Sequence, residues 1–255
     1  MRFDCNCFVG NWPFFRVRCN TLEKLAEKHR SCNFEGGFVS ALESIFYQDP
    51  YEAEVLLAEA VKGTAYRHAM ILNPTLPGWK DDLARAVRDL DIKAVRLVPG
   101  FHGYKLTDAV MDELSALVLK YNLPLIITAR MRDDRCMHMI QPEVMQLDDI
   151  IAFLDKNPKI ITLLTHLRAL EAEKVLAQFP ERTNLFTDIS GFKDGLFIID
   201  QMQEKDVMRG RMVYGSGASL MDLHATVFLM DTSEIGQEAI DEIYSGQKLL
   251  ALLDR

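Results

Sequence analysis

The sequence predicts an α/β protein that forms a single-domain (β/α)8 barrel over residues 1–255. Three observations support this fold class. Strand-like and helix-like segments alternate from one end of the chain to the other. The length of 255 residues suits one barrel of that kind. The first strand is not followed by G-x-G-x-x-G, and the chain contains no P-loop, which counts against the rival doubly wound sheet.

Eight short, β-rich segments are the expected strands, and the clearest is the apolar run at 160–165, which is typical of a buried parallel strand. The eight expected strands span residues 2–8, 37–42, 66–72, 94–98, 125–129, 160–165, 185–189 and 212–215. Amphipathic stretches between them predict helices at 21–30, 51–61, 80–90, 107–121, 147–156, 170–179 and 195–204. Thr107 stands where it could cap the fourth of these helices.

Composition narrows the class of protein. The formal net charge is -8, which argues against a nucleic-acid-binding protein. No apolar run reaches the roughly 20 residues that a membrane span needs. The N-terminus lacks the apolar core of a signal peptide, and five cysteines at uneven spacing do not form a disulfide framework. We therefore expect a cytoplasmic protein with reduced thiols and neither a nucleic-acid nor a membrane partner; a homo-oligomer is compatible with the sequence.

In a barrel of this kind, chemistry takes place where the strands end. His166 directly follows the apolar run, and Arg96 and Arg130 lie at or beside the ends of two other strands. Converging arginines bind carboxylate or phosphate groups, so one hypothesis is a pocket for a small anionic ligand. The alternative is that these cations form surface ion pairs with acidic residues such as Glu171.

Two further strand ends carry polar residues. Asp188 could supply an acid group, with Ser190 two residues later. Ser216 lies between two glycines but lacks the G-x-S-x-G elbow of a nucleophilic serine, which favours a tight turn at the edge of the ligand site.

Cys5 and Cys7 could form a metal-binding pair, since thiolates bind zinc well. Both would face the helix layer if Asn6 and Phe8 face the barrel, because strand side chains alternate. Two small buried core residues are therefore the favoured interpretation.

Several segments resemble, in order and spacing, the amidohydrolase-2 group of the amidohydrolase superfamily. They are the first strand ending in Val9-Gly10, the segments 93–104 and 163–167, the segment 184–191, the turn Tyr214-Gly215-Ser216-Gly217 and the terminal segment 240–247. The resemblance implies a metal-dependent-hydrolase fold whose metal is held by histidines on the first strand, by residues ending the fifth and sixth strands, and by an aspartate after the eighth.

This chain departs from the family pattern at most of those positions. Asn6 and Phe8 replace the two histidines, Thr128 stands at the fifth strand, and Gly217 replaces the aspartate. Only His166 keeps a ligand type that zinc prefers. We therefore expect that the usual metal site is degenerate and that the protein has no cofactor; a divalent metal such as zinc is the less favoured expectation.

The resemblance and the strand-end residues together predict an amidohydrolase-like hydrolase, or a related lyase, that acts on a small anionic or carbohydrate-derived substrate without the usual metal. The expected catalytic residues are His166 and Asp188; the expected substrate-binding residues are Asn6, Arg96, Thr128, Arg130 and Ser216. The alternative is a catalytically inactive barrel that binds a ligand or a partner, and the absent aspartate at Gly217 favours it. Whether the protein is an enzyme stays open at this stage.

Overall fold

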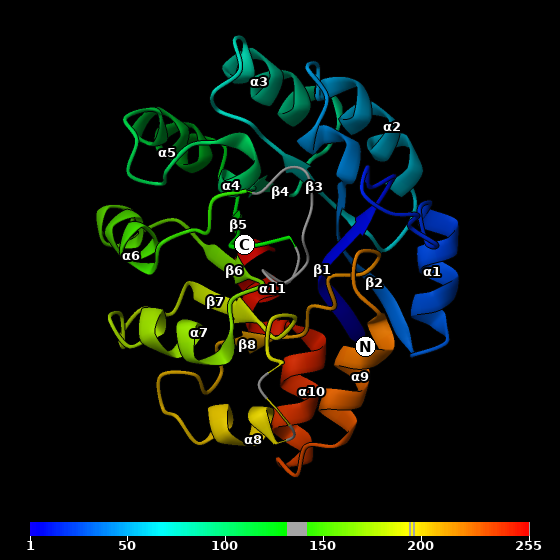
Figure 1. Ribbon diagram of the computed structural model, residues 1–255, viewed down its shortest axis with the longest axis vertical. Helices are drawn as coiled ribbons and strands as arrows, with labels where there is room; N and C mark the ends of the chain where they lie inside the picture. Colours follow the sequence, from blue (N-terminus) through cyan, green and yellow to red (C-terminus); the bar gives the residue numbers. More distant parts are fainter. Residues whose placement is uncertain (132–141, 194, 196, 255) are drawn as a thin grey trace.

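The computed structural model describes residues 1–131, 142–193, 195 and 197–254 and shows eight parallel strands in the order β1 to β8. Most of the helices lie outside the ring of strands (Figure 1). The strands are β1 Arg2–Val9, β2 Phe34–Ala41, β3 Arg67–Ile71, β4 Ala94–Leu97, β5 Leu125–Thr128, β6 Thr162–Thr165, β7 Leu185–Asp188 and β8 Met212–Val213. The predicted (β/α)8 barrel is thereby confirmed.

The helices fill the connections and the C-terminus. They are α1 Leu22–Arg30, η1 Leu42–Ile45, α2 Tyr51–Val61, α3 Trp79–Asp89, α4 Pro99–His102, α5 Val110–Lys120, α6 Leu147–Lys156, α7 Ala169–Leu176, α8 Ile198–Gln203, α9 Leu223–Asp231, α10 Gln237–Ser245 and α11 Gln247–Leu253. Thr107 does not cap α5: this helix starts at Val110 without a side-chain cap, and the neighbouring Asp108 carboxylate accepts a hydrogen bond from the Lys105 backbone instead.

Backbone hydrogen bonds between β1 and the β8 region close the barrel. Cys5 N–H donates to the Tyr214 carbonyl at 2.8 Å, and Gly217 N–H donates to the Asn6 carbonyl at 2.8 Å. The register of β1 against β2 shifts between Asp4 and Cys7. A shift of this kind changes which face a side chain takes. Cys7 packs in the shell toward the helices, whereas Cys5 packs with Phe3 inside the barrel, so the expectation that both cysteines face the helices is wrong for Cys5.

The barrel interior is built in layers. The lowest layer is apolar and takes a side chain from every strand: Phe3, Phe38, Ala69, Ala94, Ile126, Leu163, Phe186 and Val213. Leu249 and Leu250 of α11 join it, and the helix appears inside the ring of strands in Figure 1, in red. The uppermost layer includes Phe8, Trp12, Ile71 and Val98. Polar side chains lie between these two apolar layers, and they form the site described next.

No helix in the described part of the chain combines the length and apolar character needed to span a membrane.

Candidate functional site

A hydrogen-bonded group of fully buried polar side chains occupies the middle of the barrel. It joins Asn6 of β1, Arg96 of β4, Asp188 of β7 and His166, the residue after β6, none of which has measurable solvent exposure. These four residues come from strands far apart in sequence, and each stands where its strand approaches the carboxyl-terminal end. The structure therefore brings together four of the residues that the sequence singled out.

Asn6 is the centre of this group. Its Oδ1 accepts a hydrogen bond from Arg96 Nη1 at 2.8 Å, which fixes the orientation of the amide. Its Nδ2 lies 2.7 Å from Asp188 Oδ2 and 3.1 Å from His166 Nε2. The amide dipole thus points its oxygen at a cation and its N–H groups at a carboxylate and an imidazole.

Arg96 is held by oxygen acceptors from three strands. Its Nε donates to Ser40 Oγ at 2.8 Å, and Nη1 also donates to Thr128 Oγ1 at 3.1 Å. The guanidinium carbon lies 4.5 Å from the centre of the Phe8 ring, a cation–π distance. Nη2 is buried and has no hydrogen-bond partner among the described residues. Burial lowers the pKa of Arg96 to about 10, so the group keeps its charge at neutral pH.

His166 is fixed from both sides. Its Nδ1–H donates to the Arg130 carbonyl at 2.6 Å, which leaves Nε2 as the acceptor that faces Asn6. Its φ angle of 60° lies in the left-handed region, which is unusual for histidine and typical of functional sites. The backbone N–H of His166 donates to Asp188 Oδ1 at 3.0 Å and supports this conformation. Burial, with a smaller effect of Arg96, lowers the pKa of His166 to about 3, so the imidazole is neutral at pH 7.

Asp188 accepts hydrogen bonds on both oxygens. Oδ2 accepts from Ser190 Oγ at 2.6 Å as well as from Asn6. Burial raises the pKa of Asp188 to about 6, although the donors on Ser190, His166 and Asn6 act in the opposite direction. The Asp188 carboxyl therefore changes its protonation state in the pH range where general acids and bases work.

Three further residues predicted for the site have hydrogen-bond or ion-pair partners outside the central group. Thr128 does contact Arg96, but it also accepts from Thr165 Oγ1 at 3.0 Å and so serves the wall of the barrel. Arg130 forms a two-pronged ion pair with Glu171, at 2.7 and 2.9 Å, as the surface-pair alternative expected, and its Nη1 also donates to the His166 carbonyl at 2.9 Å. Ser216 hydrogen-bonds to Asp4 through both its backbone N–H and its hydroxyl, so it does not join the central group.

Gly217 lies against His166. A Cβ atom at position 217 would come within 2.6 Å of His166 Nε2 and 3.0 Å of Met221 Sδ. The φ angle of 68° at Gly217 also favours glycine. Position 217 thus does face the central group, as the resemblance implied, but here the chain leaves space for the imidazole.

A second buried polar group lies on the helix side of β1 and was not anticipated. Asp4 Oδ2 lies 3.1 Å from His29 Nε2, and His29 Nδ1 lies 2.8 Å from the Tyr66 hydroxyl. Asp4 Oδ1 accepts from the backbone N–H groups of Asn6 and Ser216, each at 3.0 Å. Two features of the sequence could have indicated this group. Asp4 is a carboxylate inside an apolar strand, and His29 lies on the same buried face of α1 as Leu22 and Leu25.

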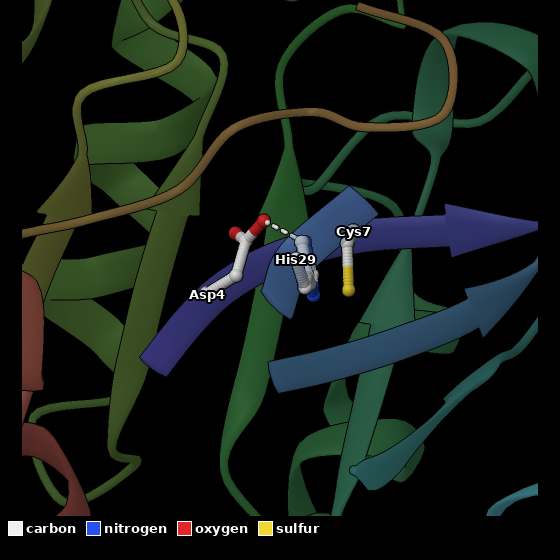
Figure 2. A group of neighbouring side chains, drawn as sticks. All are labelled: Asp4, Cys7 and His29. Carbon is white, nitrogen blue, oxygen red and sulfur yellow. Dashed lines mark hydrogen bonds and ion pairs between the residues drawn. The ribbon is translucent and has the colours of Figure 1, made fainter. Parts of the chain in front are cut away.

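Asp4, Cys7 and His29 could hold a metal ion, because their ligand atoms lie within 4.8 Å of one another. Figure 2 shows the His29 ring between the Asp4 carboxylate and the Cys7 sulfur. One thiol, one imidazole and one carboxylate are a donor set that suits zinc better than manganese. An ion would have to replace the contact between Asp4 and His29 and deprotonate Cys7, whose pKa burial raises.

The central group fits a metal less well. Among the described residues there, His166 and Asp188 carry the ligand atoms that manganese accepts most readily, and both already contact Asn6 Nδ2. An amide nitrogen with two hydrogens thus lies at the point between imidazole and carboxylate.

Comparison with solved structures finds the same fold in several proteins. One is provisionally named an amidohydrolase, from Staphylococcus aureus (TM-score 0.75, 12% identity, covering 100% of this chain and 99% of the other). Another is the 2,6-dihydroxybenzoate decarboxylase from Rhizobium (TM-score 0.73, 11% identity, 99% and 98%). A third is a dihydroxybenzoic acid decarboxylase from Polaromonas with bound manganese and the inhibitor 2-nitroresorcinol (TM-score 0.74, 12% identity, 99% and 96%).

No protein-family model matches the chain, and no curated protein is similar to it in sequence. The likeness to these solved structures shows the fold, a (β/α)8 barrel, which this chain shares with proteins named as an amidohydrolase and as decarboxylases. The prediction of no cofactor needs correction, because a structure of this fold holds manganese and the chain itself groups three potential metal ligands at Asp4, Cys7 and His29. The substitutions at Asn6, Phe8 and Gly217 bear on one place in the barrel, and they carry no conclusion about metal use by the whole protein.

Proposed function

We propose that this protein is an amidohydrolase-related enzyme that cleaves a small anionic acid, by decarboxylation or by hydrolysis. The observation that carries the proposal is Arg96, a fully buried guanidinium in the middle of the barrel whose Nη2 has no partner among the described residues. A buried donor without a partner is costly to stability unless something binds it. A substrate carboxylate would supply the missing acceptor.

The layer above Arg96 suits an aromatic acid. Phe8 lies against the guanidinium, and Trp12 contacts Phe46 and Phe101 at ring-centre distances of 5.2 and 5.4 Å. Flat apolar side chains of this kind pack well against an aromatic ring. Two proteins of the same fold are named as decarboxylases of dihydroxybenzoic acids, which carry a carboxylate on such a ring.

The central group can supply the proton that decarboxylation needs. When a carbon–carbon bond to the carboxylate breaks and carbon dioxide leaves, the ring carbon that keeps the electron pair must be protonated. Asp188, with its pKa near 6, is the proton donor we assign to this step. Neutral His166 accepts a hydrogen bond at Nε2, and Asn6 holds Arg96, His166 and Asp188 in register.

Substrate binding requires a change of conformation. Arg96, His166 and Asp188 are fully buried; Phe8 packs against Arg96 and His166, and Trp12 belongs to the same apolar layer as Phe8. We therefore infer that the aromatic layer separates when the substrate enters and then excludes water from the reacting groups.

The test is to incubate the purified protein with 2,6-dihydroxybenzoate and related aromatic carboxylates, with and without added manganese or zinc, and to follow product by chromatography. We expect turnover that falls at least a hundredfold in Arg96→Lys, which keeps the charge but loses the planar fork. Arg30→Lys, an exposed position at the end of α1, should match the wild type. Failure to convert or bind any carboxylate in the panel would contradict the proposal.

The second candidate is a barrel that binds a ligand without converting it. The specific observation in its favour is the position of the Asn6 amide, which already satisfies both His166 Nε2 and the Asp188 carboxylate. In that case an aromatic carboxylate should raise the melting temperature and the Arg96→Lys variant should lose this shift, while no product forms under any metal condition.

A further inference from the structure

A cavity of about 670 Å³ lies in the segment that connects β1 to α1, outside the central group. Its lining is Asn11, Trp12, Phe15, Arg16, Val17, Arg18, Asn20 and Lys24. Three of these side chains are cationic and none is acidic. The protein carries a net charge of -8, so a cavity whose only charged side chains are cationic has the opposite sign of charge to the protein as a whole.

The cations of this cavity are available to a ligand. Arg16 and Arg18 are exposed, and no ion pair joins either of them to a carboxylate among the described residues. Lys24 donates to Asn20 Oδ1 at 3.0 Å, an uncharged acceptor, and it forms no ion pair among the described residues. Unpaired arginines that line one cavity are suited to bind anionic groups through their paired N–H donors.

The wall that carries Lys24 is ordered by a chain of side-chain hydrogen bonds. Asn20 Nδ2 donates to Asn11 Oδ1 at 3.1 Å, and Asn11 Nδ2 donates to Glu43 Oε1 at 3.1 Å. Glu43 also accepts from the Asn11 backbone N–H at 2.7 Å, so this carboxylate is engaged behind the wall and does not line the cavity. A cation held by a fixed chain of this kind loses less side-chain entropy when a ligand binds.

Trp12 provides an independent observation. It is only 4% exposed, and its indole N–H is buried without a hydrogen-bond partner among the described residues. Trp12 also lines the cavity. Buried indole N–H groups usually find an acceptor, and a small shift of the cavity wall would let an anionic oxygen in the cavity be one.

We propose that this cavity binds a small polyanion, which is a compact group with two or more negative charges, through Arg16, Arg18, Lys24 and the indole N–H of Trp12. A phosphate monoester and a di- or tricarboxylate share this chemistry. The cavity does not include Arg96, His166 or Asp188, and it shares only Trp12 with the aromatic layer of the proposed function.

Trp12 fluorescence supplies the test. The chain has two tryptophans, and Trp79→Phe leaves Trp12 as the single reporter. This variant is titrated separately with inorganic phosphate and with citrate, with sodium chloride keeping the ionic strength constant. We expect a saturable change with at least one of the two probes, and saturation by one alone would identify that source of the charge.

Arg16→Gln and Arg18→Gln, each in the Trp79→Phe background, should weaken the binding at least tenfold. Arg30→Gln is the matched control, because it removes the same charge from an exposed position that does not line the cavity, and its affinity should stay within twofold. Melting temperatures and circular dichroism of all variants show that the fold is retained. A response that does not saturate with either probe, or an equal loss in Arg30→Gln, would overturn the proposal in favour of general charge screening.

Discussion

Asp188 and His166 are neighbouring buried groups whose pKa values move in opposite directions relative to their ordinary values. Asp188 holds its proton up to about pH 6, above the usual 3.8, whereas His166 stays neutral down to about pH 3, below the usual 6.5. The contribution of Asp188 to stability is therefore fully present below about pH 3.8 and is lost as the pH rises through about 6. The contribution of His166 is fully present above about pH 6.5 and is lost as the pH falls toward 3.

Replacing Asp188 with Asn removes the pH-dependent contribution of Asp188 to stability and keeps that of His166. A carboxyl pKa raised from 3.8 to about 6 corresponds to about 3 kcal/mol. We expect the free energy of unfolding of Asp188→Asn, relative to wild type, to rise by about 3 kcal/mol between pH 4 and pH 7. Urea denaturation at several pH values measures this difference. Two parallel stability curves would show that Asp188 titrates normally in the folded protein.

Gly217 has no side chain that could collide with the neighbouring His166 ring. An added Cβ would lie 2.6 Å from His166 Nε2, and the φ angle of 68° adds backbone strain. Gly217→Ala should therefore cost roughly 2–3 kcal/mol of unfolding free energy. Gly63→Ala is the control, because Gly63 has a φ angle of 73° but open space around it, and it should cost about 1 kcal/mol. Equal losses in the two variants, measured by urea denaturation, would remove the steric argument.

At the scale of elements, α11 packs against the lowest apolar layer of the barrel interior. Leu249 is 1% exposed and packs with the apolar layer that all eight strands contribute. Leu249→Ala should lower the unfolding free energy by roughly 3 kcal/mol, through lost burial and the cavity that remains. Leu56→Ala on α2 removes the same atoms from a side chain that is 69% exposed, and it should change stability by less than about 0.5 kcal/mol. A loss of that small size in Leu249→Ala would mean that α11 is not part of the core.

The elements also show how far the sequence alone leads. Apolar runs that alternate with amphipathic stretches predicted the eight strands, since this periodicity is set by local burial. The same logic placed Asn6, Arg96, His166 and Asp188 near one another, because the ends of parallel strands meet at one edge. It failed for Cys5, where a register shift in β1 turns the side chain inward. No local pattern reveals such a shift, since it depends on the neighbouring strand.

Partners that are distant in sequence determine the contacts of two other residues predicted for the site. Arg130 was grouped with the anion site, but Glu171, which lies 41 positions later, binds it. Ser216 was placed at the ligand site, yet Asp4, 212 positions earlier, binds it at the seam of the barrel. Both outcomes depend on which of several available carboxylates lies nearby in the folded chain, and composition cannot supply that information.

At the scale of the whole molecule, Asp4 links the first strand of the barrel to the segment that follows the last strand. Its carboxylate accepts hydrogen bonds from the backbone N–H groups of Asn6 in β1 and of Ser216 after β8. Its Oδ2 also lies 3.1 Å from Nε2 of His29 in α1. Asp4 and His29 are fully buried, so water cannot replace these interactions. The carboxylate therefore supports the closure that the backbone hydrogen bonds between β1 and the β8 region begin.

Asp4→Asn tests this role because it keeps the shape of the side chain and removes the charge. The amide offers one oxygen acceptor in place of two, and because His29 and the Ser216 hydroxyl both contact Asp4 Oδ2, replacing that oxygen removes the acceptor they share. We expect a loss of roughly 3 kcal/mol of unfolding free energy, since buried donors that lose their acceptor are strongly destabilising. Asp254→Asn is the matched control: Asp254 pairs with Arg67 at the surface with 60% of its side chain exposed, and its loss should cost less than about 1 kcal/mol. If urea denaturation gives the same small loss for both variants, closure of the barrel rests on the backbone hydrogen bonds alone.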